Sequence, residues 1–256
     1  MVEDVRGMSA WRAALAAMVV VWSSTTAEST TAGSMTAGGQ ERTSDVLAQV
    51  DHLVYATPDL DAGIRTIEGL LGVRATAGGQ HPGLGTKNAL VALGPSTYLE
   101  IIGPDPDQPT SGQPRRFGID DLKQPRLVGW VAKGTGLEPL VQKARAAGVG
   151  LGDVIAGSRK RPDGVVLAWR YTDPSVVVEY RLIPYFIDWG TSPHPAASAA
   201  RGATLVALRA EHPDASRVGK MLMQIGLALP VQPGPEAVLI ATIDSPKGRV
   251  TLRGSQ

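Results

Sequence analysis

Apolar positions follow the same order of patterns in three stretches of the chain. Residues 50–57 (VDHLVYAT) have the apolar content of a strand, and apolar residues at helical spacing follow them as far as Gly72. Strand patterns begin again at Leu127 and Thr204, and each is followed by a helical pattern. The three strands start at equal steps, since 127 − 50 and 204 − 127 are both 77. We predict a duplicated structural unit from this regularity.

The helix boundaries carry their own signals. Asp59 and Asp214 precede the first and third helical patterns, where a carboxylate can accept hydrogen bonds from the free N–H groups of the first turn. Gly72 and Gly148 are expected to end the first and second helices. Pro139 is tolerated in the first turn of the second.

Strand-like stretches follow each predicted helix. They cover residues 89–93, 97–102, 165–171, 176–187, 237–243 and 249–253. A helix followed by several strands predicts an α+β fold, with the helix against one face of a mostly antiparallel sheet. The other face is left free, so that two units can enclose a cleft.

The N-terminal stretch, residues 1–45, differs in composition from the rest. An apolar run at 13–22 is ten residues long, about half of what a membrane-spanning helix needs, although its length suits a secretory signal peptide. Residues 23–42 are largely Ser, Thr, Gly and Ala, a composition that cannot build a core. We favour a disordered tail on a cytoplasmic protein and keep a signal for export as the alternative. The remaining chain is divided into units at 46–125, 126–200 and, shorter, 201–256.

Composition excludes several classes of function. The chain has 256 residues, 25 Lys and Arg against 24 Asp and Glu, and no cysteine. Disulfides, thiolate chemistry and cysteine-ligated metals are therefore excluded. The near-neutral charge does not favour nucleic acid as a partner, and we expect the basic run at residues 159–161 to be the solvated end of a hairpin. A small molecule is the expected partner.

Several short stretches resemble the vicinal-oxygen-chelate superfamily, and within it the glyoxalase-like proteins. The opening stretch 50–60 and the strand 98–104 look like the first and last strands of one module. Residues 79–90, 186–190 and 192–195 are similar to stretches of the glyoxalase-like subgroup. The resemblance covers about residues 46–254 and implies tandem βαβββ modules whose mixed or antiparallel sheets curl around a cleft, with a shorter third βα-ββ unit. It also implies an isomerase, epimerase, dioxygenase, resistance protein or non-catalytic binding protein, and it allows a homodimer.

The resemblance also implies a metal site. In the superfamily, His or Gln from the first strand and Glu from the last strand of each module hold a divalent ion. His52 and Glu100 match in the first module, while the second has Gly129 and its neighbours where a ligand should lie. Glu179, which lies 79 residues after Glu100, and Asp188 are the alternative second carboxylates. Imidazole and carboxylate ligands suit Zn, Ni, Mn or Fe(II).

Other residues are candidates for contact with substrate. His81 and Asn88 are predicted to lie at the lip of the pocket, where His81 is also a candidate third ligand; Trp189 and His194 lie in the second family-like stretch. Glu100 is the candidate catalytic group, as a ligand or as a base. His212 is expected only in local turn chemistry.

Two hypotheses of function remain. The first is a metal-assisted isomerase, lyase or dioxygenase that acts on a small oxygenated metabolite. The alternative is a metal-free protein that binds and sequesters an apolar or aromatic small molecule, which the missing ligands of the second module favour.

Overall fold

The computed structural model describes residues 46–108 and 112–255. The predictions for residues 1–45 lie outside this range. Three helices are α2 (Leu60–Leu71), α3 (Leu137–Ala146) and α4 (Ala215–Gln224). The strands are β1 (Val50–Ala56), β2 (Thr76–His81), β3 (Thr86–Gly94), β4 (Thr97–Pro104), β5 (Arg126–Lys133), β6 (Val154–Lys160), β7 (Val166–Thr172), β8 (Tyr185–Asp188), β9 (Thr204–His212), β10 (Val231–Pro233), β11 (Val238–Ser245) and β12 (Gly248–Ser255). Short 3-10 turns are η1 (Arg116–Asp121), η2 (Glu179–Arg181) and η3 (Pro195–Ala197).

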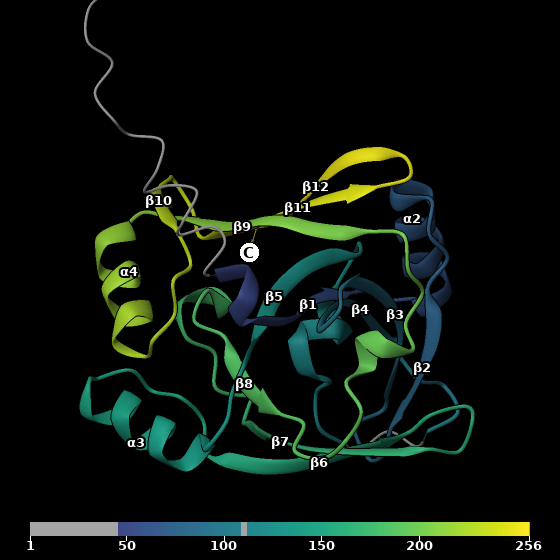
Figure 1. The fold of residues 1–256 in the computed structure, drawn as a ribbon, viewed down its shortest axis with the longest axis horizontal. Coiled ribbons are helices and arrows are strands. Elements are labelled where there is room, and N and C mark those ends of the chain that lie inside the picture. Colours follow the sequence, from purple (N-terminus) through teal and green to yellow (C-terminus); the bar gives the residue numbers. More distant parts are fainter. Residues whose placement is uncertain (1–45, 109–111, 256) are drawn as a thin grey trace, which may run out of the picture. The chain divides into compact units, whose positions relative to one another are not determined.

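Eight of these strands close into a barrel, in the order β1-β4-β3-β2-β6-β7-β8-β5 (Figure 1). Strands β1–β4 form one half and β5–β8 the other. Within each half the first strand pairs in parallel with the last, and the two halves join where β1 runs antiparallel to β5. The α+β class and the curled sheet around a cavity are therefore as predicted. A barrel of eight strands is wide enough to hold one small ligand.

The third stretch forms a separate four-stranded sheet, in the order β10-β9-β11-β12. Here β9 lies between its parallel partner β10 and its antiparallel partner β11, so this stretch does not repeat the strand order of the barrel halves. The 77-residue step therefore reflects a similar order of strands and helix along the chain, but the strands of the third stretch are not arranged in the sheet as those of the barrel halves are. Figure 1 shows this sheet beside the barrel, where β11 and β12 contact β5 and β9 contacts β3.

Helix α2 shows how local sequence fixes an element. The Asp59 side chain accepts a hydrogen bond from the backbone N–H of Ala62, as predicted for an N-cap. Gly72 ends the helix at φ 69°, a left-handed conformation that glycine adopts without strain. Asp214 caps α4 in the same way through the N–H of Arg217.

The inner barrel strands are buried on both faces. On β1 and β4, one set of alternate residues packs outward into the largest core, which includes Leu53, Leu99 and Ile101. The other set faces the barrel interior and includes Val54 and Ile102. A polar side chain on the inner set is therefore held away from bulk water, and its position requires an explanation.

One predicted strand is wrong. The stretch 176–187 forms the η2 turn and only the short β8, and residues 179–181 have φ values of 45°, 54° and 64°. Three successive left-handed residues break the strand pattern, even though the stretch 176–187 as a whole is rich in apolar and β-branched side chains. Three further strands, β2, β6 and β10, were not among the predicted stretches; β2 (TAGGQH) has the composition of a loop.

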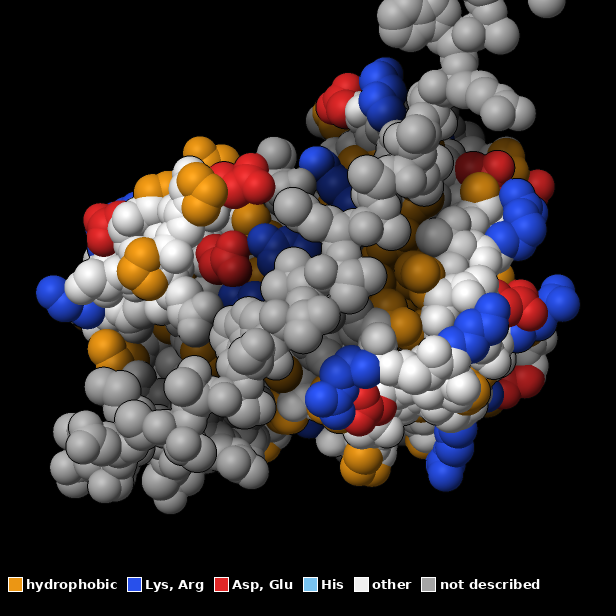
Figure 2. All heavy atoms as spheres, turned by 90° about the horizontal axis from the view of Figure 1, so that it is seen from above, with side chains coloured by type: hydrophobic (Ala, Val, Ile, Leu, Met, Phe, Trp, Pro, Cys, Tyr) orange, Lys and Arg blue, Asp and Glu red, His pale blue; other side chains and the backbone are white. Residues whose placement is uncertain are grey.

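The described surface shows no single dominant charge. On the face seen in Figure 2, Lys and Arg side chains lie among Asp and Glu side chains rather than in one basic patch. In the part of the chain that the structure describes, none of the helices has the length and apolar content to cross a membrane.

Candidate functional site

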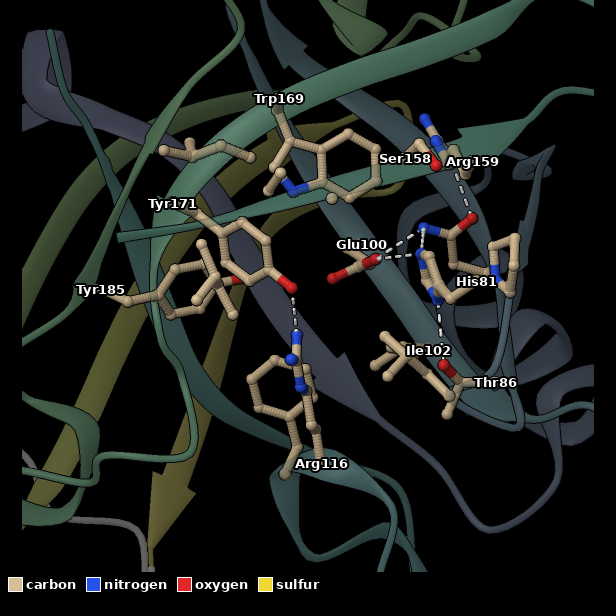
Figure 3. A pocket seen from close by; sticks show the side chains of 18 of the residues that line it. His81, Thr86, Glu100, Ile102, Arg116, Ser158, Arg159, Trp169, Tyr171 and Tyr185 are labelled. Atoms are coloured by element: carbon tan, nitrogen blue, oxygen red, sulfur yellow. Dashed lines mark hydrogen bonds and ion pairs between the residues drawn. The ribbon is translucent and has the colours of Figure 1, made fainter. Parts of the chain in front are cut away.

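A cavity of about 850 Å³ lies inside the barrel and is lined by both halves. Polar side chains from β1–β4 gather on one side of it, and aromatic rings from β7 and β8 face them (Figure 3). Among the candidates from the sequence, those that line it are His52, His81, Asn88, Glu100 and Trp189.

Glu100 is the acidic side chain of this cavity. It lies on the inward face of β4, between Tyr98 and Ile102, and is 6% exposed. Its Oε1 accepts a hydrogen bond of 2.6 Å from the Asn88 side-chain amide. Its Oε2 lies 3.8 Å from His52 Nε2, and among the described residues no side chain donates a hydrogen bond to it. Figure 3 shows this second oxygen pointing into the cavity.

Asn88 holds Glu100 in place through a chain of hydrogen bonds. Arg159 Nη1 donates to Asn88 Oδ1 (2.8 Å), which directs the amide nitrogen toward Glu100 and toward His81 Nε2 at 3.3 Å. His81 Nε2 therefore acts as an acceptor, and its Nδ1–H donates to Thr86 Oγ1 (3.0 Å). The amide orientation and the histidine tautomer are both fixed by this one network.

A glycine makes room for the network. A Cβ atom at Gly78 would lie 2.1 Å from Asn88 Oδ1 and 2.5 Å from the Arg159 guanidinium. The absence of a side chain on this part of β2 lets the two polar groups meet over the backbone. The Gly-rich composition that makes β2 resemble a loop is therefore part of the site.

His81 is held neutral. Burial lowers its pKa most strongly, Glu100 opposes this effect, and the charges of Arg159, Arg116 and His52 add to it, so that the pKa falls to about 4. At neutral pH the ring consequently presents an uncharged Nε2 to the Asn88 amide.

His52 faces Glu100 from β1 and is oriented by the residue before it. The pairing of β1 with β5 shifts register between Val50 and His52, which leaves Asp51 as an extra residue. Asp51 Oδ1 accepts a hydrogen bond of 2.7 Å from His52 Nδ1. The Nε2 of His52 is then turned to the cavity, 3.4 Å from the Tyr185 hydroxyl.

Asp51 is a buried carboxylate with donors from both barrel halves. Its Oδ2 accepts hydrogen bonds from Trp189 Nε1 (3.0 Å) and His194 Nε2 (3.2 Å). Burial alone would raise its pKa, but the hydrogen bonds from His194 and His52 outweigh burial and lower the pKa to about 2. Asp51 is thus ionised and anchors His52 to the loop that follows β8.

Aromatic side chains form the opposite wall. Trp169, Tyr171 and Tyr185 line the cavity, and Tyr171 and Tyr185 contact each other edge to face at 6.2 Å. Burial raises the pKa of Tyr185 well above its usual value, and Glu100 raises it further, so the phenol keeps its proton. Arg116 Nη1 donates to the Tyr171 hydroxyl (2.7 Å), which leaves the hydroxyl's own proton to donate elsewhere.

The arrangement does not fit a resident metal ion. Among the described residues no three His, Asp or Glu side chains are placed to hold one. His81 Nε2 and Glu100 Oε1 are 3.8 Å apart, and the Asn88 amide nitrogen already hydrogen-bonds both atoms. A hydrogen-bond donor thus satisfies the two acceptors that a metal would bridge.

Two of the predicted ligands lie elsewhere. Glu179 is on η2, where it pairs with Arg217 (2.6 Å) and lies 3.4 Å from His212. Asp188 does not line the cavity, and its carboxylate accepts a hydrogen bond from the N–H of Gly190. His194 lies behind Asp51 rather than on the cavity wall.

Strand register explains these placements. In the first half, His52 of β1 pairs with Tyr98 of β4. In the second half, Val131 of β5 pairs in the same way with Tyr185 of β8. Two residues further along, the inward position is Glu100 in the first half and Ile187 in the second. The second half therefore has Val131 and Ile187 where the first has its histidine and its carboxylate.

Sequence reasoning missed several residues of the site. Arg159 is 3% exposed and joins the cavity wall, although its basic run was expected to be solvated. Asp51, Arg116 and Tyr185 carried no motif. The one usable signal was Asp51 directly before His52, since a carboxylate beside an imidazole commonly orients it.

The geometry can be compared with known proteins. The model of a family described as "Glyoxalase-like domain" matches residues 50–226, which is more than half of the chain. The chain belongs to this glyoxalase-like family. The resemblance to the vicinal-oxygen-chelate superfamily is therefore confirmed, and the matched residues contain the whole barrel and every polar side chain described above. A search of curated proteins finds no match.

Solved structures agree with the fold. A hypothetical protein from Staphylococcus aureus is similar with a TM-score of 0.54 and 13% identity, over 80% of this chain and 84% of that one. Methylmalonyl-CoA epimerase from Mycobacterium tuberculosis gives 0.37 and 16%, over 60% and 94%. A mutant of 4-hydroxymandelate synthase from Streptomyces coelicolor gives 0.41 and 11%, over 81% and 63%. At these identities the first match supports the fold alone, and the other two carry no argument about function.

Proposed function

We propose that this glyoxalase-like protein binds a small oxygenated metabolite in the barrel and transfers a proton on it, as an isomerase or a lyase. The observation that carries the proposal is Glu100. One carboxylate oxygen is held by Asn88, and the other points into the cavity without a donor among the described side chains. A buried carboxylate with one oxygen held in place and the other available is suited to act as a general base.

The groups around Glu100 are suited to form and stabilise a carbanion or enolate next to a carbonyl group of the ligand. Glu100 Oε2 takes the proton from the carbon beside the carbonyl group. The hydroxyl of Tyr185 donates a hydrogen bond to the carbonyl oxygen as negative charge develops there. Return of the proton to the former carbonyl carbon of a 2-hydroxycarbonyl compound, with transfer of a proton between its two oxygens, gives isomerisation. Departure of a leaving group, with its bonding electrons, from the carbon on the other side of the carbanion gives a lyase reaction.

The residues around Glu100 have separate tasks in this scheme. Asn88 and Arg159 position Glu100 through contacts of 2.6 and 2.8 Å. His52, held by Asp51, supplies an imidazole 3.8 Å from Glu100 Oε2, a gap that one ligand oxygen or a water can bridge. The donor set does not fit a metal ion, and the proton transfer uses the side chains alone.

Isotope exchange tests the proposal. The full chain is incubated in D₂O with a panel of small 2-oxo and 2-hydroxycarbonyl compounds, and loss of the C–H signal beside the carbonyl is followed by proton NMR. For a compound that is turned over, Glu100→Gln is expected to lower the exchange rate by about 100-fold or more. The matched control, Glu138→Gln, changes an exposed carboxylate on α3 and should keep the wild-type rate. If wild type exchanges no compound faster than Glu100→Gln, the proposal is wrong.

Binding without chemistry is the second candidate. It is favoured by the aromatic wall of Trp169, Tyr171 and Tyr185, which offers a large contact surface to an apolar ligand. Saturable binding of a compound that undergoes no exchange would select this function instead.

A further inference from the structure

The charges that line the cavity do not balance. Its ionic side chains are Glu100, Arg116 and Arg159, so the formal sum, with the lining histidines His52 and His81 counted as neutral, is 2 − 1 = +1. Neither arginine has an acidic partner within 4.0 Å among the described residues, whereas Arg115 beside them is paired with Asp120. Charged groups in a partly enclosed cavity are costly without a counter-charge.

Arg159 is already engaged with the polar side of the site. It donates to Asn88, and Asn88 donates to Glu100, so this guanidinium is linked to the one carboxylate of the cavity. Arg116 is left as the positive charge without such a link. Its hydrogen bond goes to a neutral hydroxyl, that of Tyr171, and its guanidinium carbon lies 5.3 Å from the centre of that ring.

The backbone that carries Arg116 is firmly held. The backbone N–H of Arg115 donates to Asp120 (2.7 Å), and the Arg115 side chain donates to the carbonyl of Gly85 (2.8 Å). The next residue, Phe117, is buried in a left-handed conformation at φ 65° beneath the guanidinium of Arg181. Arg116 is therefore presented to the cavity by a fixed segment, and in Figure 3 it lies on the side of Tyr171, away from His81.

We infer that the ligand is a monocarboxylate whose charged group is bound by Arg116 and by the hydroxyl of Tyr171. One negative charge neutralises the sum of +1. The planar fork of an arginine matches the two oxygens of a carboxylate. The aromatic rings beside Arg116 then contact the apolar body of the ligand. The further statement that the reacting carbon faces Glu100 rests on the proposed function.

The test measures binding and needs no turnover. Phenylacetate and its neutral isostere phenylacetamide are titrated into the full chain by calorimetry, with phenyl phosphate as a third probe. Wild type is expected to bind phenylacetate about tenfold or more tightly than the amide. Arg116→Gln should abolish this preference, and Arg116→Lys, which keeps the charge without the fork, should retain a smaller one. The matched control Arg145→Gln changes an exposed arginine and should behave as wild type.

Two results would overturn the inference. One is wild type binding the acid no more tightly than the amide, or Arg116→Gln keeping the wild-type preference. The other is tighter binding of phenyl phosphate than of phenylacetate, which would assign the site to phosphate groups. Failure of proton transfer is seen separately, because Glu100→Gln is expected to bind phenylacetate at least as tightly as wild type once the opposing carboxylate is removed.

Discussion

The two halves of the barrel share an order of strands but present different chemistry to the same cavity. Strands β1–β4 contribute the acceptors and donors, with Glu100 held by Asn88. Strands β5–β8 contribute aromatic rings, and at the inward position that corresponds to Glu100 they place Ile187. Under the proposed function, the first half carries the proton transfer and the second half encloses the ligand.

Side-chain hydrogen bonds also link the two halves. Asp51 of the first half accepts hydrogen bonds from Trp189 and His194, which follow β8. Arg159 of the second half donates to Asn88 of the first. The polar side chains of the first half are thus held in place by hydrogen bonds from residues of the second half and of the loop that follows it.

Removal of the Asp51 charge is expected to have the largest effect. In Asp51→Asn the amide cannot accept from all three donors that Asp51 serves, so the free energy of unfolding at pH 7 should fall by about 3 kcal/mol. Chemical denaturation measures it, and the exposed Asp153→Asn is the matched control. A loss no greater than in the control would contradict the role of Asp51 as the link between halves.

The same carboxylate predicts an acid transition. Because folding lowers the pKa of Asp51 from 3.8 to about 2, its stabilisation is complete above pH 3.8 and is lost as the pH falls toward 2. The loss corresponds to about 2 kcal/mol, and Asp51→Asn should not show it. Denaturation curves for both proteins across this range check the slope.

Because the fold holds His81 neutral, we predict a second loss of stability, at higher pH than the loss that involves Asp51. Its pKa falls from 6.5 in the unfolded chain to about 4 in the fold, so the unfolded chain binds the extra proton as the pH drops through this range. The free energy of unfolding should therefore decrease by about 3 kcal/mol between pH 6.5 and pH 4. His81→Gln should flatten this part of the profile. An unchanged slope in the variant would show that His81 is not held neutral.

Asn88→Ala should separate positioning from binding. Without the amide, Glu100 loses its 2.6 Å hydrogen bond and its contact with the second half through Arg159. The exchange rate is expected to fall about 10- to 100-fold, while phenylacetate affinity changes little, because Arg116 and the aromatic wall are untouched. Equal losses of exchange and of affinity would contradict a positioning role.

Glu179→Gln should have the smallest effect. Its ion pair with Arg217 lies away from the cavity, and a pair of this kind contributes at most about 1 kcal/mol when one partner is half exposed. Probe binding and exchange should remain at wild-type levels. A large loss of either would return Glu179 to the site for which the sequence made it a candidate.

The sequence predicted the parts of this structure that depend on local patterns. The period of apolar residues located most strands, and Asp59 and Asp214 cap the helices as expected. Four of the five candidates that line the cavity, His52, His81, Asn88 and Glu100, form its polar side. Their neighbourhood could be inferred only through the family resemblance, because β1, β3 and β4 come together by strand pairing.

What could not be predicted depends on register. From β1 to β5 the paired positions are 131 − 52 = 79 residues apart, but from β4 to β8 they are 185 − 98 = 87 apart. Most of this difference arises between β7 and β8, in the segment that contains the left-handed turn at 179–181, because Leu90, which pairs with Glu100, and Tyr171, which pairs with Ile187, are only 171 − 90 = 81 residues apart. An offset of 79 therefore pointed to Glu179, whereas the structural counterpart of Glu100 is Ile187. Arg159 was hidden for a similar reason, since its burial follows from the pairing of β2 with β6.

The division of labour between the halves is tested most directly by measuring exchange and binding on one preparation of Glu100→Gln. The account predicts that this variant loses about 100-fold or more of the exchange rate and binds phenylacetate at least as tightly as wild type. Retention of exchange would contradict the role of Glu100 as the base. Loss of phenylacetate binding together with exchange would show that Glu100 holds the ligand, and that the two halves are not divided as proposed.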